Sequence, residues 1–209
     1  MTSGDATVTG IVVVAHGGQS DSLAPTAPTQ LAVLRMAPIA AAIRNALKGS
    51  GAIVCRPRFA VRGWNGRLAS PVPDLNRILD ELAERHGQVP IVLVGHSMGG
   101  RAVLRCAGHP GVTAVAGLAP WLPEGEPVDQ LAGRRVLLVH GTADRITDPL
   151  GTWAYAVRAR AVTEVTTVEM PGGDHAMLRH AHRWHQLAAD FARSALRHDP
   201  FTASRFPAG

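Results

Sequence analysis

Short apolar runs rich in β-branched residues alternate along the chain with longer amphipathic segments. The apolar runs predict buried strands at residues 8–15, 52–59, 89–94, 112–118, 134–139 and 164–170. The segments between and after them predict helices at residues 29–36, 39–48, 74–86, 101–107, 149–160 and 178–196. Strands that alternate with helices are typical of a mostly parallel sheet with helices on both faces. We therefore expect an α/β fold, a three-layer sandwich built on about six strands.

The length of 209 residues suits one domain with a sizeable core, so residues 1–209 are expected to form a single unit. Residues 1–8 and 199–209 are expected to be flexible tails. The longest predicted connection, residues 119–133, is too short to fold into a lid. Cys55 and Cys106 fall on a predicted strand and helix and are expected to be buried free thiols.

The net charge of +5 comes almost entirely from arginine, since Lys48 is the only lysine. The arginines are scattered, without a basic stripe or interleaved aromatic residues, so the charge does not favour nucleic-acid binding. It could attract anionic substrates weakly. The sequence has no apolar run long enough to span a membrane, and residues 1–10 lack the features of a secretory signal. We expect a cytoplasmic protein without a membrane span.

A possible nucleophile follows the third predicted strand, where four apolar residues run into Gly95-His96-Ser97-Met98-Gly99-Gly100. A strand, a sharp turn and a helix are the context in which Gly-x-Ser-x-Gly exposes a serine hydroxyl. Small residues at Gly95 and Gly99 would let the strand and helix approach closely. The alternative is a glycine-rich turn whose serine only caps the next helix.

An acid and a base follow later strands of the same predicted sheet. Ser97 follows the third strand, Asp144 the fifth and His175 the sixth, so all three are expected at the carboxyl edge where such sheets bind ligands. A serine hydroxyl needs a base within hydrogen-bond reach and an acid to orient that base. The chain order Ser, Asp, His is the one expected for a nucleophile on such a turn.

Other acids are weaker candidates for the same role. Asp148 precedes Pro149 and has the pattern of a helix N-cap, so Asp144 is favoured over it. Asp174 is adjacent to His175 in sequence, which is poor geometry for an orienting partner, so we expect it to bond within its turn.

The remaining histidines are expected to have structural roles or none. Those at strand ends, beside glycines, should shape turns or make structural hydrogen bonds; they are His16, His96 and His140. The last predicted helix carries His180, His182 and His185, of which only His182 and His185 share a face. A metal site there would need further ligands, so no metal is expected.

Two glycine-rich turns could supply an oxyanion hole. The backbone N–H of Gly18, after the first strand, could pair with that of Met98, after the nucleophile. Trp64 and Trp121 fall in loops on the same side and are candidates to wall a substrate pocket. Either tryptophan could instead cover the edge of the core.

As a set, these motifs resemble the α/β-hydrolases. The matching segments are His16-Gly17-Gly18, Gly95 to Gly100, His140-Gly141-Thr142-Ala143-Asp144 and Gly172-Gly173-Asp174-His175. The small size and missing cap look most like the dienelactone hydrolase and carboxylesterase branch. The resemblance implies Ser97 as nucleophile, His175 as base and acid, and Asp144 as orienting acid. Dienelactone enzymes use a cysteine nucleophile, so the serine here argues against a dienelactone substrate.

The expected activity is hydrolysis of carboxylic esters or thioesters of small to medium acyl groups through an acyl-enzyme, with no cofactor. The expected partner is a small-molecule ester, and the oligomeric state is not predicted. Acyl transfer, perhydrolysis and peptide or C–C cleavage could use the same residues. A ligand-binding protein without catalysis is a further alternative on this fold.

Overall fold

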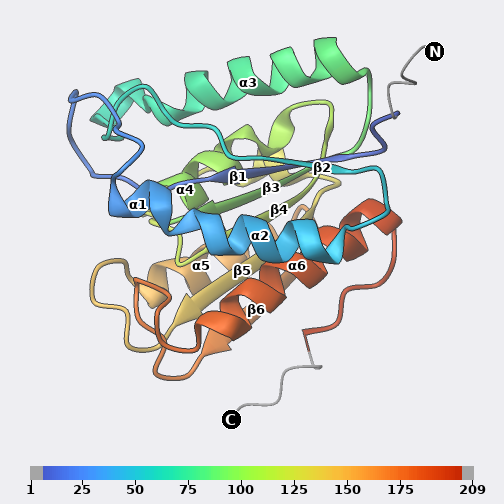
Figure 1. Cartoon of the computed structure of the whole chain (residues 1–209). Coiled ribbons are helices and arrows are strands. Elements are labelled where there is room, and N and C mark those ends of the chain that lie inside the picture. The colour runs from blue at the N-terminus through green and yellow to red at the C-terminus, as the bar shows by residue number, and fades with distance from the viewer. Residues whose placement is uncertain (1–6, 204–209) are drawn as a thin grey trace.

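All six predicted strands are present in the computed structural model, which describes residues 7–203, and they form one parallel sheet (Figure 1). The strands are β1 (Ile11–Ala15), β2 (Ile53–Cys55), β3 (Ile91–His96), β4 (Val112–Leu118), β5 (Arg135–Gly141) and β6 (Val165–Met170). Their order across the sheet is β2-β1-β3-β4-β5-β6, and every neighbouring pair is parallel. The predicted fold class is therefore confirmed.

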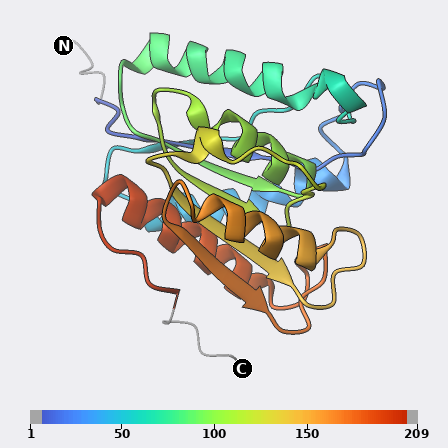
Figure 2. The same cartoon turned by 180° about the vertical axis from the view of Figure 1, so that it is seen from behind.

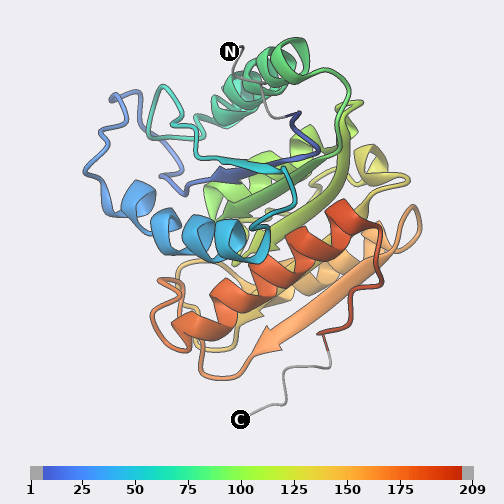
Figure 3. The same cartoon turned by 45° about the vertical axis from the view of Figure 1, so that its right-hand side comes forward.

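Helices cover both faces of the sheet. They are α1 (Leu31–Leu34), α2 (Met36–Ala46), α3 (Pro71–His86), α4 (Met98–Arg105), α5 (Pro149–Ala159) and α6 (Ala181–Arg197). Three short 3-10 helices are η1 (Gly66–Leu68), η2 (Cys106–Gly108) and η3 (Asp129–Leu131). Helices α2 and α6 lie side by side on one face (Figures 1 and 3), while α3, α4 and α5 lie on the other (Figure 2).

Each face of the sheet has its own apolar core, because successive side chains of a strand point to opposite faces. In β1, Val12 and Val14 pack toward α2 and α6, whereas Val13 and Ala15 pack toward α3 and α4. This two-sided burial explains why β1 is apolar throughout rather than alternating.

Several predicted boundaries differ from the structure, and two of these differences have a clear physical reason. Helix α6 begins at Ala181, not at residue 178, because Met177 and His180 have φ values of 56° and 58°, which are not helical. Strand β2 ends at Cys55, just before Pro57, which has no N–H to donate to a neighbouring strand.

The predicted tails are described only in part, since residues 1–6 and 204–209 lie outside the described range. Within that range, Phe201 packs edge-on against Phe191 of α6, with ring centroids 5.3 Å apart. Residues 199–203 are therefore held against the core cluster of α6, which differs from the expected flexible tail.

The connections place a topological switch point between β1 and β3. The chain after β1 leads to α2 on one face, and the chain after β3 leads to α4 on the other, so the two loops diverge. In open parallel sheets this switch point is where ligands bind, beyond the carboxyl ends of the strands. Ala15 and Gly95 are register partners, which places the turn after β1 beside Ser97.

Three further predictions concern the cysteines, membrane-spanning helices and the connection between β4 and β5. Cys55 and Cys106 are both free, as predicted, but only Cys106 is buried, since Cys55 is partly exposed. Among residues 7–203, no helix is long and apolar enough to cross a membrane. Between β4 and β5 the chain forms only η3, with no larger folded element.

Candidate active site

Ser97 sits on a strained turn between β3 and α4. Its φ of 55° and ψ of −120° lie in a region that non-glycine residues rarely adopt, at a cost of roughly 1–3 kcal/mol. A Cβ on Gly95 would overlap the backbone of Gly99, and a Cβ on Gly99 would overlap the carbonyl of His16. The glycines therefore permit the close approach of strand and helix that the tight turn requires.

The three residues predicted from strand ends meet in one hydrogen-bonded chain. His175 Nε2 lies 3.0 Å from Ser97 Oγ, and His175 Nδ1 lies 2.8 Å from Asp144 Oδ2. These distances let Nδ1–H donate to the carboxylate while Nε2 accepts from the serine hydroxyl. The geometry is that of a nucleophile, a base and an orienting acid.

The carboxylate of Asp144 is fully buried and held by several donors. Burial by itself would raise its pKa, but hydrogen bonds from His140, His175 and the backbone N–H groups of Thr147 and Ile146 lower it well below its ordinary value. These hydrogen bonds therefore favour the ionised carboxylate. The sequence analysis did not link His140 or Thr147 to this carboxylate.

The loops that carry the acid and the base are bonded to each other. Ala143 N–H donates to the carbonyl of Gly173 at 3.0 Å, and Gly172 N–H donates to Thr142 Oγ1 at 2.8 Å. A Cβ on Gly141 would overlap the backbone of Gly173. Close backbone packing thus sets the distance between Asp144 and His175.

The two residues predicted to supply an oxyanion hole lie next to each other. A Cβ on Gly18 would overlap the side chain of Met98, so the two predicted residues are neighbours. Among the described residues, none accepts a hydrogen bond from Gly18 N–H or Met98 N–H. The adjacent Gln19 N–H is bound to Arg62 O at 2.8 Å, which fixes the turn.

The histidines that precede Gly17 and Ser97 make buried hydrogen bonds, as predicted. His16 Nδ1–H donates to Gly17 O at 2.6 Å, and its Nε2 accepts from Phe59 N–H at 3.1 Å. His96 Nε2–H donates to His175 O at 2.8 Å. Burial lowers the pKa of both, that of His96 to about 3.

The prediction that Trp64 walls a substrate pocket is wrong. Its side chain is only 2% exposed and stacks on the guanidinium of Arg101, 3.8 Å from the ring centroid. Trp64 therefore covers the core beside α4 and offers almost no surface to a substrate. This was the alternative that the sequence left open for it.

Trp121 packs edge-on against Trp64, with ring centroids 6.2 Å apart, and also contacts Arg101, but it is less buried. Its backbone N–H donates to Ser97 O at 3.1 Å, and its half-buried side chain lines a cavity of about 430 Å³. The cavity also reaches Thr147, which contacts Asp144 and His175, and Trp121 remains a candidate wall.

A buried carboxylate holds the loop after β4 and was not foreseen. The Glu126 side chain is 2% exposed and pairs with Arg101 and with Arg105, whose Nε lies 2.7 Å from Glu126 Oε2. Arg158 of α5 donates to Glu126 O at 2.7 Å. These bonds join the loop to α4 and α5. No motif in the sequence indicates these pairs, and the loop also carries Glu124 and Asp129, so nothing singles out Glu126.

The rival acids have the structural roles expected of them. Asp148 caps α5, accepting from Leu150 N–H and Gly151 N–H at 2.9 and 3.2 Å. Asp174 Oδ1 accepts from Leu178 N–H within its turn at 3.0 Å. Within residues 7–203, no group of three or more His, Cys, Asp or Glu residues could hold a metal ion.

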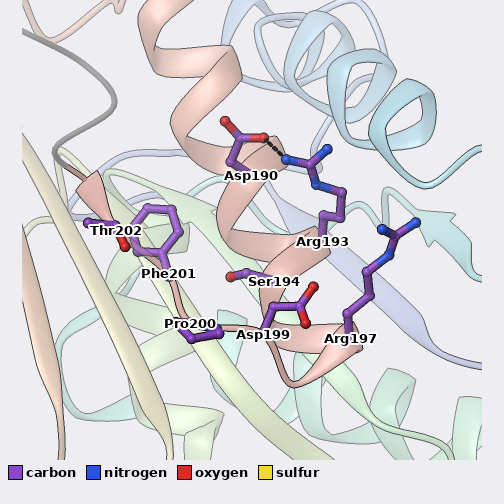
Figure 4. Close-up of a pocket in the computed structure, with 8 residues that line it drawn as sticks. All are labelled: Asp190, Arg193, Ser194, Arg197, Asp199, Pro200, Phe201 and Thr202. Atoms are coloured by element: carbon purple, nitrogen blue, oxygen red, sulfur yellow. Dashed lines mark hydrogen bonds and ion pairs between the residues drawn. The ribbon is translucent and has the colours of Figure 1, made fainter.

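A second cavity of about 470 Å³ lies far from Ser97, at the end of α6 (Figure 4). Helix α6 starts after the loop that carries His175 and runs back along the sheet, so its last turn lies at the opposite edge. In this cavity Asp190 pairs with Arg193 at 2.7 Å, which offsets the charge of the arginine. The cavity is separate from the candidate active site.

The topology and the motifs define the chain as having the α/β-hydrolase fold, and comparisons with known proteins agree. A family described as serine aminopeptidase, S33, matches residues 47–135, a segment that contains Ser97 but neither Asp144 nor His175. No curated protein sequence matches the chain significantly.

Several solved structures share the fold over nearly the whole chain. Est1E from Butyrivibrio proteoclasticus has a TM-score of 0.68 at 15% identity, covering 93% of this chain and 91% of that one. An α/β serine hydrolase without a lid from Xanthomonas campestris has a TM-score of 0.62 at 18% identity, covering 95% and 87%. A monoacylglycerol lipase from Paleococcus ferrophilus has a TM-score of 0.63 at 18% identity, covering 91% and 96%.

Proposed function

We propose that the protein is a serine hydrolase that cleaves carboxylic esters or thioesters of small to medium acyl groups. The observation that carries this proposal is the chain from Ser97 Oγ through His175 to Asp144, with separations of 3.0 and 2.8 Å. The strained backbone of Ser97 supports it, because such strain persists where function needs it. The hydrolases among the similar structures agree with this class of reaction.

In the acylation step, Ser97 Oγ attacks the ester carbonyl carbon and passes its proton to His175 Nε2. Asp144 stabilises the resulting imidazolium through Nδ1–H. The carbonyl oxygen becomes an oxyanion that accepts hydrogen bonds from Gly18 N–H and Met98 N–H. When the tetrahedral intermediate collapses, the C–O bond to the alcohol breaks and the alcohol leaves with the proton from His175.

In the deacylation step, water takes the place of the alcohol. His175 Nε2 removes a proton from the water as its oxygen attacks the acyl carbon. Collapse of the second intermediate breaks the bond to Ser97 Oγ, which recovers the proton from His175. The products are the free acid and the enzyme in its starting state.

The loop after β4 supports a preference for small to medium acyl groups. Between β4 and β5 the described chain folds only into η3, so no lid covers Ser97 from this side. The cavity beside Trp121, of about 430 Å³, is at the small end of ligand pockets. Trp121 forms one wall of that cavity.

The test is hydrolysis of a short p-nitrophenyl ester together with labelling by a fluorophosphonate. Ser97→Ala is expected to lower kcat by on the order of 10⁴- to 10⁶-fold and to abolish labelling. Ser50→Ala, at the amino-terminal side of β2, is the matched control and should keep full activity. Equal turnover by Ser97→Ala and the parent would refute the proposal, and ligand binding without labelling would favour a non-catalytic protein.

Peptide hydrolysis is a second candidate, because the matching family is described as serine aminopeptidase. It would use the same acylation step with an amine as the leaving group. The relative rates on p-nitroanilides of single amino acids and on p-nitrophenyl esters distinguish the two activities. Added alcohols or hydrogen peroxide would reveal acyl transfer or perhydrolysis by diverting the acyl group from water.

A further inference from the structure

The Asp144 carboxylate is shared by two imidazole rings. His175 Nδ1 lies 2.8 Å from Asp144 Oδ2, and His140 Nε2 lies 3.1 Å from the same oxygen. Thr147 Oγ1 is 2.9 Å from this oxygen as well. The other oxygen, Oδ1, accepts from the N–H groups of Ile146 and Thr147 at 2.8 and 3.0 Å. Both carboxylate oxygens are thus bonded without the solvent.

The ring of His140 is held in one orientation. It comes from the end of β5 and is fully buried, and its Nδ1 lies 2.7 Å from Thr152 Oγ1 in the first turns of α5. Since the carboxylate can only accept, the proton lies on Nε2, and Nδ1 accepts from the Thr152 hydroxyl. Trp153 packs edge-on to the ring at a centroid distance of 6.2 Å.

A hydrogen-bond donor to a carboxylate weakens the interaction of that carboxylate with its other hydrogen-bond partners. Each hydrogen bond to Asp144 Oδ2 takes up part of the negative charge that His175 Nδ1–H would otherwise experience. In a site with no water around the carboxylate, this effect is larger than at the surface. The second imidazole also prevents the carboxylate from rotating away from His175.

We propose that His140 is a positioning residue, which fixes the Asp144 carboxylate and withdraws part of its charge from His175. The inference rests on the proposed roles of Ser97, Asp144 and His175. His140 touches neither the substrate nor the reacting atoms. It acts through Asp144 and through Thr147, whose Oγ1 lies 3.2 Å from His140 Nε2 and 3.1 Å from His175 Nδ1. Thr152 in turn fixes the ring of His140.

The neighbouring charged groups are few and are unchanged by substitution of His140. His96 of β3 faces His175, with ring centroids 4.8 Å apart. The charge of Arg35, at the start of α2, contributes to lowering the pKa of His96. Asp148 at the start of α5 is engaged as its N-cap, and Glu169 of β6 is the exposed register partner of His140. The variants below leave all of these in place.

The main test compares His140→Leu with His140→Gln. Leucine fills the space but donates nothing, whereas the glutamine amide can still donate to Asp144 and accept from Thr152. His140→Leu is expected to lower kcat by about 10- to 100-fold with KM unchanged, because small misplacements of reacting groups are costly. His140→Gln should retain activity within about threefold of the parent.

The second readout is the titration of His175, followed by NMR of its ring carbon-bound proton. Without the donor from His140, Asp144 attracts the proton on His175 more strongly, so the pKa of His175 should rise in His140→Leu by roughly half a pH unit or more. The acidic limb of kcat/KM should move to higher pH by the same amount. The control is His109→Leu, since His109 is remote from the triad. Its Nε2 lies 3.2 Å from Asp80 Oδ1.

A Thr152→Val variant covers the case in which His140→Leu does not fold. Valine keeps the shape and removes only the hydroxyl that donates to His140 Nδ1. We therefore expect a smaller fall in kcat and a smaller rise in the pKa of His175 than in His140→Leu. In the parent, NMR should detect downfield ring N–H protons of His175 and His140 in addition to those of His16 and His96. His140→Gln should lose only the signal of His140.

The NMR results do not depend on catalysis, so they separate this inference from the proposed function. If Ser97→Ala has no effect on turnover but the pKa of His175 still rises in His140→Leu, the proposed function fails and the network stands. If hydrolysis depends on Ser97 but folded His140→Leu keeps the parent's kcat and His175 titration, the inference is wrong. If only stability falls in both His140 variants, His140 is a packing residue.

Discussion

His96, the residue before Ser97, donates through Nε2 to the backbone carbonyl of His175 at 2.8 Å. The strand end that carries the nucleophile therefore also holds the loop that carries the base. The bond needs a proton on Nε2, and burial lowers the pKa of His96 to about 3. The same burial links the stability of the fold to pH.

We predict that the free energy of unfolding falls as the pH drops below about 6.5. The pKa of His96 is about 3 in the folded protein and 6.5 when exposed, so between these values the unfolded chain binds the additional proton. The loss is about 1.4 kcal/mol per pH unit for such a group in this range. Urea unfolding of the parent and of His96→Gln from pH 4 to 8 measures this loss of unfolding free energy. The variant should lose less stability on acidification, and identical pH dependences would contradict the assignment.

Gly95→Ala is predicted to unfold the protein or destabilise it by more than about 3 kcal/mol, because its Cβ would overlap the backbone of Gly99. Gly108→Ala is the matched control, since its Cβ would meet only Gln130 at an ordinary 3.4 Å. Circular dichroism and thermal melting compare the two. A Gly95→Ala protein as stable as Gly108→Ala would mean that the turn has more room than the structure shows.

Glu126→Gln is predicted to lower stability by about 3–5 kcal/mol, because it leaves the buried part of Arg101 without its counter-charge. Glu81→Gln breaks the exposed pair with Arg77 and should cost less than about 1 kcal/mol. Denaturant unfolding of both variants gives the difference. Equal costs would show that Glu126 is more hydrated than its 2% exposure indicates.

Asp144→Asn and Asp148→Asn should separate catalysis from capping. Asp144→Asn should lower kcat by on the order of 10⁴-fold, because an amide cannot orient and stabilise His175 as a carboxylate does. Asp148→Asn should leave kcat within about twofold, since asparagine is also a good N-cap. Ester hydrolysis at saturating substrate measures both. A large loss in Asp148→Asn alone would reverse the choice of acid.

Much of the fold and the three candidate catalytic residues follow from local sequence. Six apolar runs are long enough to be buried strands, and each is separated from the next by a helical segment, which favours parallel pairing. Parallel strands put their carboxyl ends at one edge, so residues that directly follow strands meet there. Ser97, Asp144 and His175 were predictable for this reason, as was the N-cap role of Asp148.

The partners of these residues depend on contacts that local sequence does not encode. Trp64 and Trp121 both lie in loops at the same edge, yet Arg101 stacks on Trp64 at 3.8 Å and buries it, while Trp121 lines a cavity. His140 is only four residues before Asp144, but whether its ring reaches the carboxylate depends on how the intervening turn folds back.

The sequence alone therefore determined the order of strands and helices, and which residues follow each strand. The tertiary structure decided which side chains share a hydrogen bond, because that depends on the face to which each side chain points and on close backbone packing. Glu126 and Arg101 are 25 positions apart and meet only because the loop after β4 packs on α4. The period of apolar residues is a local property, whereas the pairing of buried polar groups is settled only when the layers pack.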